Sequence, residues 1–107
     1  MIETWRASSP DEAAAIAAEV KEANIRGRGG AGFPAGVKWG FLPKDSKVAP
    51  YLVINADEGE PGTFKDRVLL TSHADLLFDG MTVAAYAVGA GRGFLYLVAV
   101  MDWSSRA

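Results

Sequence analysis

The chain has 107 residues, of which half are hydrophobic, and a formal net charge of −2 at neutral pH. This length allows at most one small domain, and the weakly acidic balance excludes a general attraction to nucleic acid or to membrane surfaces. The chain contains no cysteine, which excludes disulfides, thiolate metal ligands and a conventional iron–sulfur cluster within it.

The first predicted element is an alanine-rich helix over 10–23. Ser9 is expected to be its N-cap, Pro10 its first residue and Glu12 the acid that closes a capping box. Asn24 suits the end of the helix. Because its apolar face is mostly alanine, we expect this helix to pack closely against a larger body.

A dense glycine-rich loop follows from Ile25 to Trp39, with the sequence IRGRGGAGFPAGVKW. Glycines permit positive φ and let bare backbone approach a ligand, and successive N–H groups can form a concave anion nest. Arg28 and Lys38 would add positive charge beside it. The loop therefore predicts a phosphate-binding site for a nucleotide.

Two common nucleotide motifs do not fit this loop. Gly27, Gly29 and Gly32 match the dinucleotide pattern G-x-G-x-x-G, but that pattern normally follows a strand, and here a helix is predicted. A Walker A loop is excluded because Val37 separates Gly36 from the lysine and no Ser or Thr follows. Two other interpretations stay open: a flexible surface loop, and an RNA-binding segment of the RGG type.

A short helix is predicted to begin at Pro34, to include Phe41 and to stop at Pro43. Aromatic residues cluster around it. Phe33, Trp39 and Phe41 either stack on a nicotinamide, adenine or flavin ring or belong to the core. For Trp39 the core is the preferred interpretation.

A short buried strand is predicted over 51–54, and an acidic loop, NADEGEPGT, follows it directly. Asp57, Glu58 and Glu60 offer acceptors for ribose or ribityl hydroxyls, and Asn55 offers both a donor and an acceptor. In isolation the loop could also be a solvated acidic turn or a cation site. Because ligands of α/β sheets gather at the carboxyl ends of strands, the two loops together favour a nucleotide site.

The remaining elements predict a strand–helix–strand crossover. A helical turn is expected around 65–70, a helix over 73–88 with Ser72 as its N-cap, and an apolar strand over 94–100. Gly80 is expected to allow a close neighbour on this helix. The order indicates a βαβ unit with a parallel sheet.

No catalytic or metal-binding constellation can be assembled from the sequence. His73 is the only histidine and is predicted to be a capping or surface residue. Chemistry would therefore be carried by a bound cofactor that the protein positions. There is no signal-peptide pattern, and the longest strongly apolar run, 81–90, is too short to cross a bilayer. We therefore expect a cytoplasmic protein, or one peripheral on the inner membrane face as part of a complex, without membrane insertion.

Two motifs in order, GRGGAGFPAGVKW and NADEGEPGTFKDR, resemble the flavin- and NADH-binding (NuoF-type) subunit of respiratory complex I. Diaphorase subunits of NAD-reducing hydrogenases and NAD-dependent formate dehydrogenases are similar. The resemblance implies an α/β, Rossmann-like FMN-binding domain with a short parallel sheet and flanking helices. In this family FMN takes a hydride from NADH and passes single electrons to iron–sulfur clusters, within a multi-subunit assembly.

The resemblance also implies roles for single residues. The first motif, with Lys38, is expected at the FMN phosphate. Asn55, Asp57 and Glu58 would contact the flavin side, while Glu60 and two phenylalanines would face NADH. The residues expected to bind the cofactors are Gly27, Arg28, Gly29, Gly30, Gly32, Phe33, Lys38, Phe41, Asn55, Asp57, Glu58 and Glu60.

Members of the family are several times longer than this chain. They continue with a second glycine/glutamate motif that completes the FMN site, then a ubiquitin-like domain and a helical domain with cluster-ligating cysteines. This chain has VAVMDWSSRA where the family runs on through Arg-Gly-Glu-Tyr. We therefore expect an N-terminal fragment with a helical segment over 1–24, a partial FMN/NADH-binding α/β domain over 25–97 and an atypical tail over 98–107.

From the sequence we hypothesise that the chain is part of an NADH dehydrogenase (diaphorase) module. This module would work with other subunits of a complex I-like, hydrogenase or formate dehydrogenase assembly. The alternative is a truncated, non-catalytic nucleotide-binding remnant or interaction module. These two hypotheses differ in whether the chain holds FMN in a state that NADH can reduce.

Overall fold

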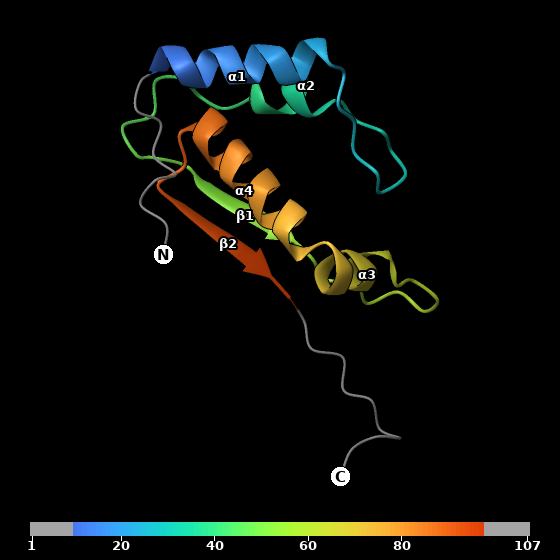
Figure 1. Cartoon of the computed structure of the whole chain (residues 1–107). Helices are drawn as coiled ribbons and strands as arrows, with labels where there is room; N and C mark the ends of the chain where they lie inside the picture. The colour runs from blue at the N-terminus through green and yellow to red at the C-terminus, as the bar shows by residue number, and fades with distance from the viewer. Residues whose placement is uncertain (1–9, 98–107) are drawn as a thin grey trace.

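A computed structural model describes residues 10–97, which form a two-stranded parallel sheet with helices on one face and at one end (Figure 1). In chain order the elements are α1 (Pro10–Glu22), α2 (Ala35–Trp39), β1 (Tyr51–Asn55), α3 (Lys65–Ser72), α4 (Ala74–Val88) and β2 (Arg92–Tyr96). Helix α4 packs on both strands, and α1 contacts both α4 and α2. The expected α/β class, with a short parallel sheet and flanking helices, is confirmed.

Helix α1 agrees with its sequence signals. Asp11 and Glu12 lie in its first turn and Lys21 in its last, which suits the helix dipole. Asn24 takes the left-handed conformation (φ 54°), and the N–H of Ile25 reaches back to the carbonyl of Val20 at 3.5 Å. This is the αL ending that asparagine tolerates. Ser9, the predicted N-cap, lies outside the described residues.

Helix α2 is shorter than predicted. It ends at Trp39, with Gly40 as its C-cap, so Phe41 lies outside it. Beyond this point the N–H of Phe41 bonds the carbonyl of Lys38 at 3.1 Å, a spacing of three residues that tightens the chain into a turn. The prediction of a helix up to Pro43 was wrong because glycine, a poor helix former, ends it earlier.

Strands β1 and β2 pair in parallel, with Val53 opposite Phe94, and this confirms the predicted βαβ crossover. Strand β2 begins at Arg92, two residues before its predicted start. Its partner determines this start, since Arg92 lies opposite Tyr51. The last residues of the predicted strand, 98–100, lie outside the described part of the chain.

The junction between α3 and α4 differs from the prediction. Ser72 is the last residue of α3 and not the N-cap of α4; His73 occupies the joint and makes no side-chain cap. The N–H of His73 donates to the carbonyl of Leu69 at 2.8 Å, and α3 therefore extends beyond its predicted end near residue 70. Gly80 has no neighbour within 4 Å of a Cβ built on it, so the expected close approach is absent among the described residues.

Few hydrophobic side chains are buried within residues 10–97: Met81, Ala85 and Ala90. In both strands exposed and half-buried residues alternate, and α4 packs on the sheet. The exposed set includes Tyr51, Val53, Phe94 and Tyr96. Parallel sheets are normally covered on both faces. The outer face of this sheet is therefore an unusually apolar exposed surface.

Candidate functional site

The glycine loop, residues 26–33, is a hairpin-like excursion between α1 and α2. Two backbone hydrogen bonds close its base. The N–H of Gly27 donates to the carbonyl of Phe33, and the N–H of Ala35 donates to that of Ile25, both at 2.9 Å. The two helices therefore hold the base of the loop.

Gly36 fixes the α2 side of this base. It is buried, and a Cβ built on it would lie 2.6 Å from both the Cα and the Cβ of Lys21. Only glycine lets α2 approach α1 this closely, because real Cβ atoms do not tolerate such a contact. Sequence reasoning did not assign this role to Gly36; the available signal was a glycine inside a short predicted helix.

The tip of the glycine loop presents backbone donors. Within residues 10–97, none of the N–H groups of residues 28–32 donates a hydrogen bond to the protein. Gly30 and Gly32 have φ values of 116° and 65°, which glycine adopts without strain. The tip therefore offers unpaired N–H groups to an anion.

Three basic residues lie in the glycine loop or in the helix after it, and the structure uses them in two different ways. Arg28 and Lys38 form no ion pair with any residue in the described range, and Arg28 is exposed. Arg26 instead donates from Nη1 to the carbonyl of Gly32 at 3.0 Å and braces the loop. Sequence reasoning missed this bracing role, because nothing local distinguishes Arg26 from Arg28.

Phe33 and Phe41 come together beside the base of the loop. Their ring centroids lie 6.1 Å apart at an interplanar angle of 55°. Both side chains are exposed, so a planar ligand could reach either ring. Trp39 lines a separate groove.

The acidic loop, residues 56–63, begins at the carboxyl end of the sheet. The N–H of Ala56 donates to the carbonyl of Tyr96 at 2.9 Å, so the loop leaves the point where both strands end. The side-chain Oδ1 of Asn55 accepts a hydrogen bond from the N–H of Asp57 at 2.9 Å. This local turn fixes the first residues of the loop.

The three acids of this loop have different surroundings. Glu58 is half-buried, and its carboxylate accepts from the N–H groups of Asp66 at 2.9 Å and Arg67 at 3.4 Å. Asp57 and Glu60 are exposed, and their carboxylates accept no hydrogen bond from residues 10–97. Asp57 and Glu60 are therefore the acids available to a ligand.

The two loops project from the same side of the molecule, the glycine loop from the α1–α2 end and the acidic loop beside α3 (Figure 1). In the described chain no hydrogen bond or ion pair joins them. A ligand shared by both loops would therefore contact donors on one side and acceptors on the other.

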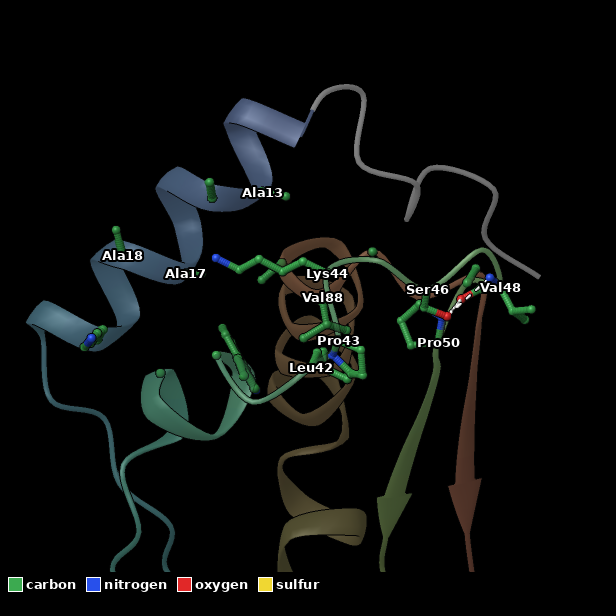
Figure 2. Close-up of a pocket in the computed structure, with 18 residues that line it drawn as sticks. Ala13, Ala17, Ala18, Leu42, Pro43, Lys44, Ser46, Val48, Pro50 and Val88 are labelled. Atoms are coloured by element: carbon green, nitrogen blue, oxygen red, sulfur yellow. Dashed lines mark hydrogen bonds between the residues drawn. The ribbon is translucent and has the colours of Figure 1, made fainter.

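A separate cavity lies away from these loops. It is an open groove of about 900 Å³ between α1 and the segment 42–50, lined mainly by alanines, prolines and Val88 (Figure 2). Pro50 and Gly89 place it at the amino ends of the strands. None of the predicted site residues lines it. Ligands of parallel sheets bind at the carboxyl ends of the strands, where the acidic loop lies, so the groove is at the opposite end of the sheet from that loop.

Two further properties of residues 10–97 bear on the type of site. No group of three or more His, Cys, Asp or Glu side chains is placed to hold a metal ion. No helix in this range is long and apolar enough to span a membrane. The exposed groups of the two loops are thus backbone donors, cations, carboxylates and aromatic rings.

Comparison with known proteins identifies the family of the chain. Residues 20–101 match the family described as the Nuo51 FMN-binding domain. The chain belongs to this family. It is 53% identical over 89 residues to one F-type chain of NADH-quinone oxidoreductase from Rhizobium meliloti, and 50% identical over 90 residues to the F-type chain from Escherichia coli. Each alignment covers 83% of this chain and 20% of the relative.

A solved structure has the same fold as this Nuo51-family chain. The crystal structure of an NAD+-reducing NiFe-hydrogenase in the air-oxidized state superimposes with a TM-score of 0.72 at 54% sequence identity. The match covers 85% of this chain and 16% of that one. The chain therefore has the α/β fold of an FMN-binding family and spans about a fifth of the curated relatives.

Proposed function

We propose that this chain provides the phosphate-binding and part of the flavin- and NADH-binding surface of an NADH dehydrogenase (diaphorase) module. One observation carries the proposal: within residues 10–97, the N–H groups of residues 28–32 stay unpaired, in a loop that contains Arg28, which makes no ion pair there. The FMN-binding family to which the chain belongs supports the same ligand. In a complex I-like assembly the acceptor would be quinone, as in the names of the relatives.

The glycine loop would hold the FMN phosphate. Free backbone donors and positive φ values at Gly30 and Gly32 suit an anion. Arg28 and Lys38 would add charge-assisted hydrogen bonds, which are about twice as strong as neutral ones. Gly27 and Gly29 would keep the backbone bare at the closest approach. No Cβ contact within 4 Å restricts Gly29, which leaves the space open.

The acidic loop would contact the flavin side. Asp57 would accept hydrogen bonds from ribityl hydroxyls, because its carboxylate is exposed and not used within the described residues. The side chain of Asn55 already accepts from the N–H of Asp57, and its amide N–H₂ remains to donate. Glu58 would act on the flavin side through its two contacts with α3, which fix the loop.

NADH would approach from the aromatic side. The exposed rings of Phe33 and Phe41 would stack on its planar groups, and Glu60 would accept hydrogen bonds from its ribose or amide. When bound, FMN would supply the hydride-accepting step and the release of single electrons. The residues of this chain would bind and orient both nucleotides.

The electrons would leave this chain for clusters elsewhere. Cysteine is absent from its 107 residues, so iron–sulfur ligands would come from other segments or subunits. Partners would be subunits of a complex I-like, hydrogenase or formate dehydrogenase assembly, in the cytoplasm or peripheral to a membrane. Neither nucleic acid nor membrane insertion is part of the proposal.

A second candidate function is a nucleotide-binding remnant or interaction module without catalysis. The small buried core and the exposed apolar face of the sheet favour it for the separate chain. In this case FMN would bind weakly or would not be reduced by NADH.

Anaerobic flavin reduction distinguishes the two candidates. The purified chain is mixed with FMN, passed through a desalting column and then treated with NADH while flavin absorbance is recorded. Retained flavin that bleaches with NADH supports the diaphorase role. Retained flavin that does not bleach supports the non-catalytic module. Absence of binding at high micromolar FMN would contradict the diaphorase role for this chain and leave the interaction module.

A further inference from the structure

The start of α3 lacks an ordinary cap. Its N-cap position is Phe64, whose side chain makes no capping hydrogen bond. The first N–H groups of any helix have no partner within the helix and need acceptors. Here the carboxylate of Glu58 supplies them, accepting from the N–H groups of Asp66 at 2.9 Å and Arg67 at 3.4 Å.

This cap comes from outside the helix and from the ligand-facing loop. Glu58 lies eight residues before Asp66, so its two bonds close the acidic loop onto α3. Two other contacts fix the same loop. Asn55 accepts from the N–H of Asp57 at 2.9 Å, and Thr63 donates its hydroxyl to the carbonyl of Glu60 at 2.5 Å.

The burial pattern separates Glu58 from its neighbours. Glu58 is half-buried against α3, whereas Asp57 and Glu60 on either side are exposed. A negative charge at a helix N-terminus is also favourable for the dipole. The same carboxylate attracts Lys65, whose pKa is raised chiefly by its hydrogen bond with Asp66 and further by Glu58.

We propose that Glu58 is a positioning residue: its carboxylate fixes the acidic loop to the start of α3 and so holds Asp57 and Glu60 exposed at the carboxyl end of β1. The positioning of the loop follows from the ligand-free geometry. Its effect on flavin binding rests on the proposed function.

The first arm of the test needs no ligand. Amide hydrogen exchange at Asp66 is measured in the whole chain for wild type, Glu58→Ala and Glu58→Gln, with Asp57→Ala as the matched control. Loss of a charged hydrogen-bond partner should speed exchange at Asp66 by about tenfold in Glu58→Ala. Glu58→Gln keeps an acceptor oxygen and should restore most of the protection, and Asp57→Ala should change nothing.

The second arm measures FMN dissociation constants of the same variants. Glu58→Ala should weaken binding by about tenfold, because Asp57 loses its fixed position, and Glu58→Gln should recover most of this loss. A direct role of the Glu58 charge at the flavin would instead make Gln as weak as Ala.

The two arms fail separately. Unchanged exchange at Asp66 in Glu58→Ala would overturn the positioning role, whatever the flavin result. Faster exchange with no FMN binding by the wild type would retain the contact with α3, overturn the proposed effect on flavin and contradict the proposed function. If Glu58→Ala does not fold, Glu58→Gln is measured in its place. It should keep most of the protection at Asp66 and most of the FMN affinity.

Discussion

The glycine loop and the acidic loop differ in the contacts that hold them. Backbone hydrogen bonds close the base of the glycine loop and one side chain, Arg26, braces it, while within the described residues the N–H groups of its tip stay unpaired. In the acidic loop side chains make the contacts: Asn55 and Glu58 accept from backbone N–H groups, while Asp57 and Glu60 stay exposed. Substitutions that add side-chain atoms should therefore destabilise the glycine loop, whereas substitutions that remove side-chain acceptors should destabilise the acidic loop.

The largest effect is expected at the base of the glycine loop. Gly36→Ala would place a Cβ 2.6 Å from the backbone of Lys21, and such overpacking typically costs about 1–3 kcal/mol of unfolding free energy. Urea unfolding measures it. Gly80→Ala is the matched control: space around its Cβ is open, so α4 should gain about 0.5–1 kcal/mol. Equal stability of Gly36→Ala and wild type would contradict the close α1–α2 contact.

A smaller effect is expected at the tip. Gly32 has φ 65°, and Gly32→Ala should cost about 1 kcal/mol because L-residues are strained in the left-handed region. Gly29→Ala, at a position with no positive φ and open space, is the control and should be close to wild type. Thermal unfolding of the two variants checks the difference. Identical melting curves would show that the tip does not keep this conformation in solution.

The acidic loop should respond to the loss of an acceptor. Asn55→Ala removes the bond to the N–H of Asp57 and should cost about 0.5–1.5 kcal/mol. Asn55→Asp keeps an acceptor oxygen and should lose less. Urea unfolding of the three proteins gives the ranking, and an Asp variant no better than the Ala variant would show that the turn does not depend on this acceptor.

The smallest effect concerns the exposed ion pair between Lys65 and Asp66, 2.5 Å apart. The pKa of Lys65 is raised from its ordinary value of 10.5, mainly by the hydrogen bond with Asp66. A raised lysine pKa means that the folded state binds the proton more tightly, so the contribution is complete below the ordinary pKa and is lost as pH rises through the raised one. The difference in Tm between wild type and Lys65→Gln should be small, constant from about pH 7 to about pH 9, and lost above the raised pKa. A difference that grew with pH would contradict this sign.

The order of elements and the position of both loops could be predicted from the sequence, because those signals are local. Interactions between residues close in sequence determine three of these features: the alanine-rich α1, its αL ending at Asn24 and the apolar strand after Ala49. Gly89, with φ 69°, likewise ends α4 within the range where the helix was expected to end.

What could not be predicted depends on contacts between distant segments. Gly36 matters because of Lys21, and Gly80 proved open because no other described element reaches it. The boundary at Ser72 shifted because α3 continues to His73. The contact of Glu58 with α3 could not be predicted either, because the sequence does not show which of the three loop acids accepts from the start of α3. The roles of individual residues toward FMN and NADH remain predictions.

The most direct test of the central claim compares FMN with riboflavin, which lacks the phosphate. Flavin fluorescence titrations of the chain should give clearly tighter binding for FMN. The double variant Arg28→Ala/Lys38→Ala should remove most of this preference while leaving riboflavin binding unchanged. Equal affinities for FMN and riboflavin in the wild type would contradict the assignment of the glycine loop as the phosphate site.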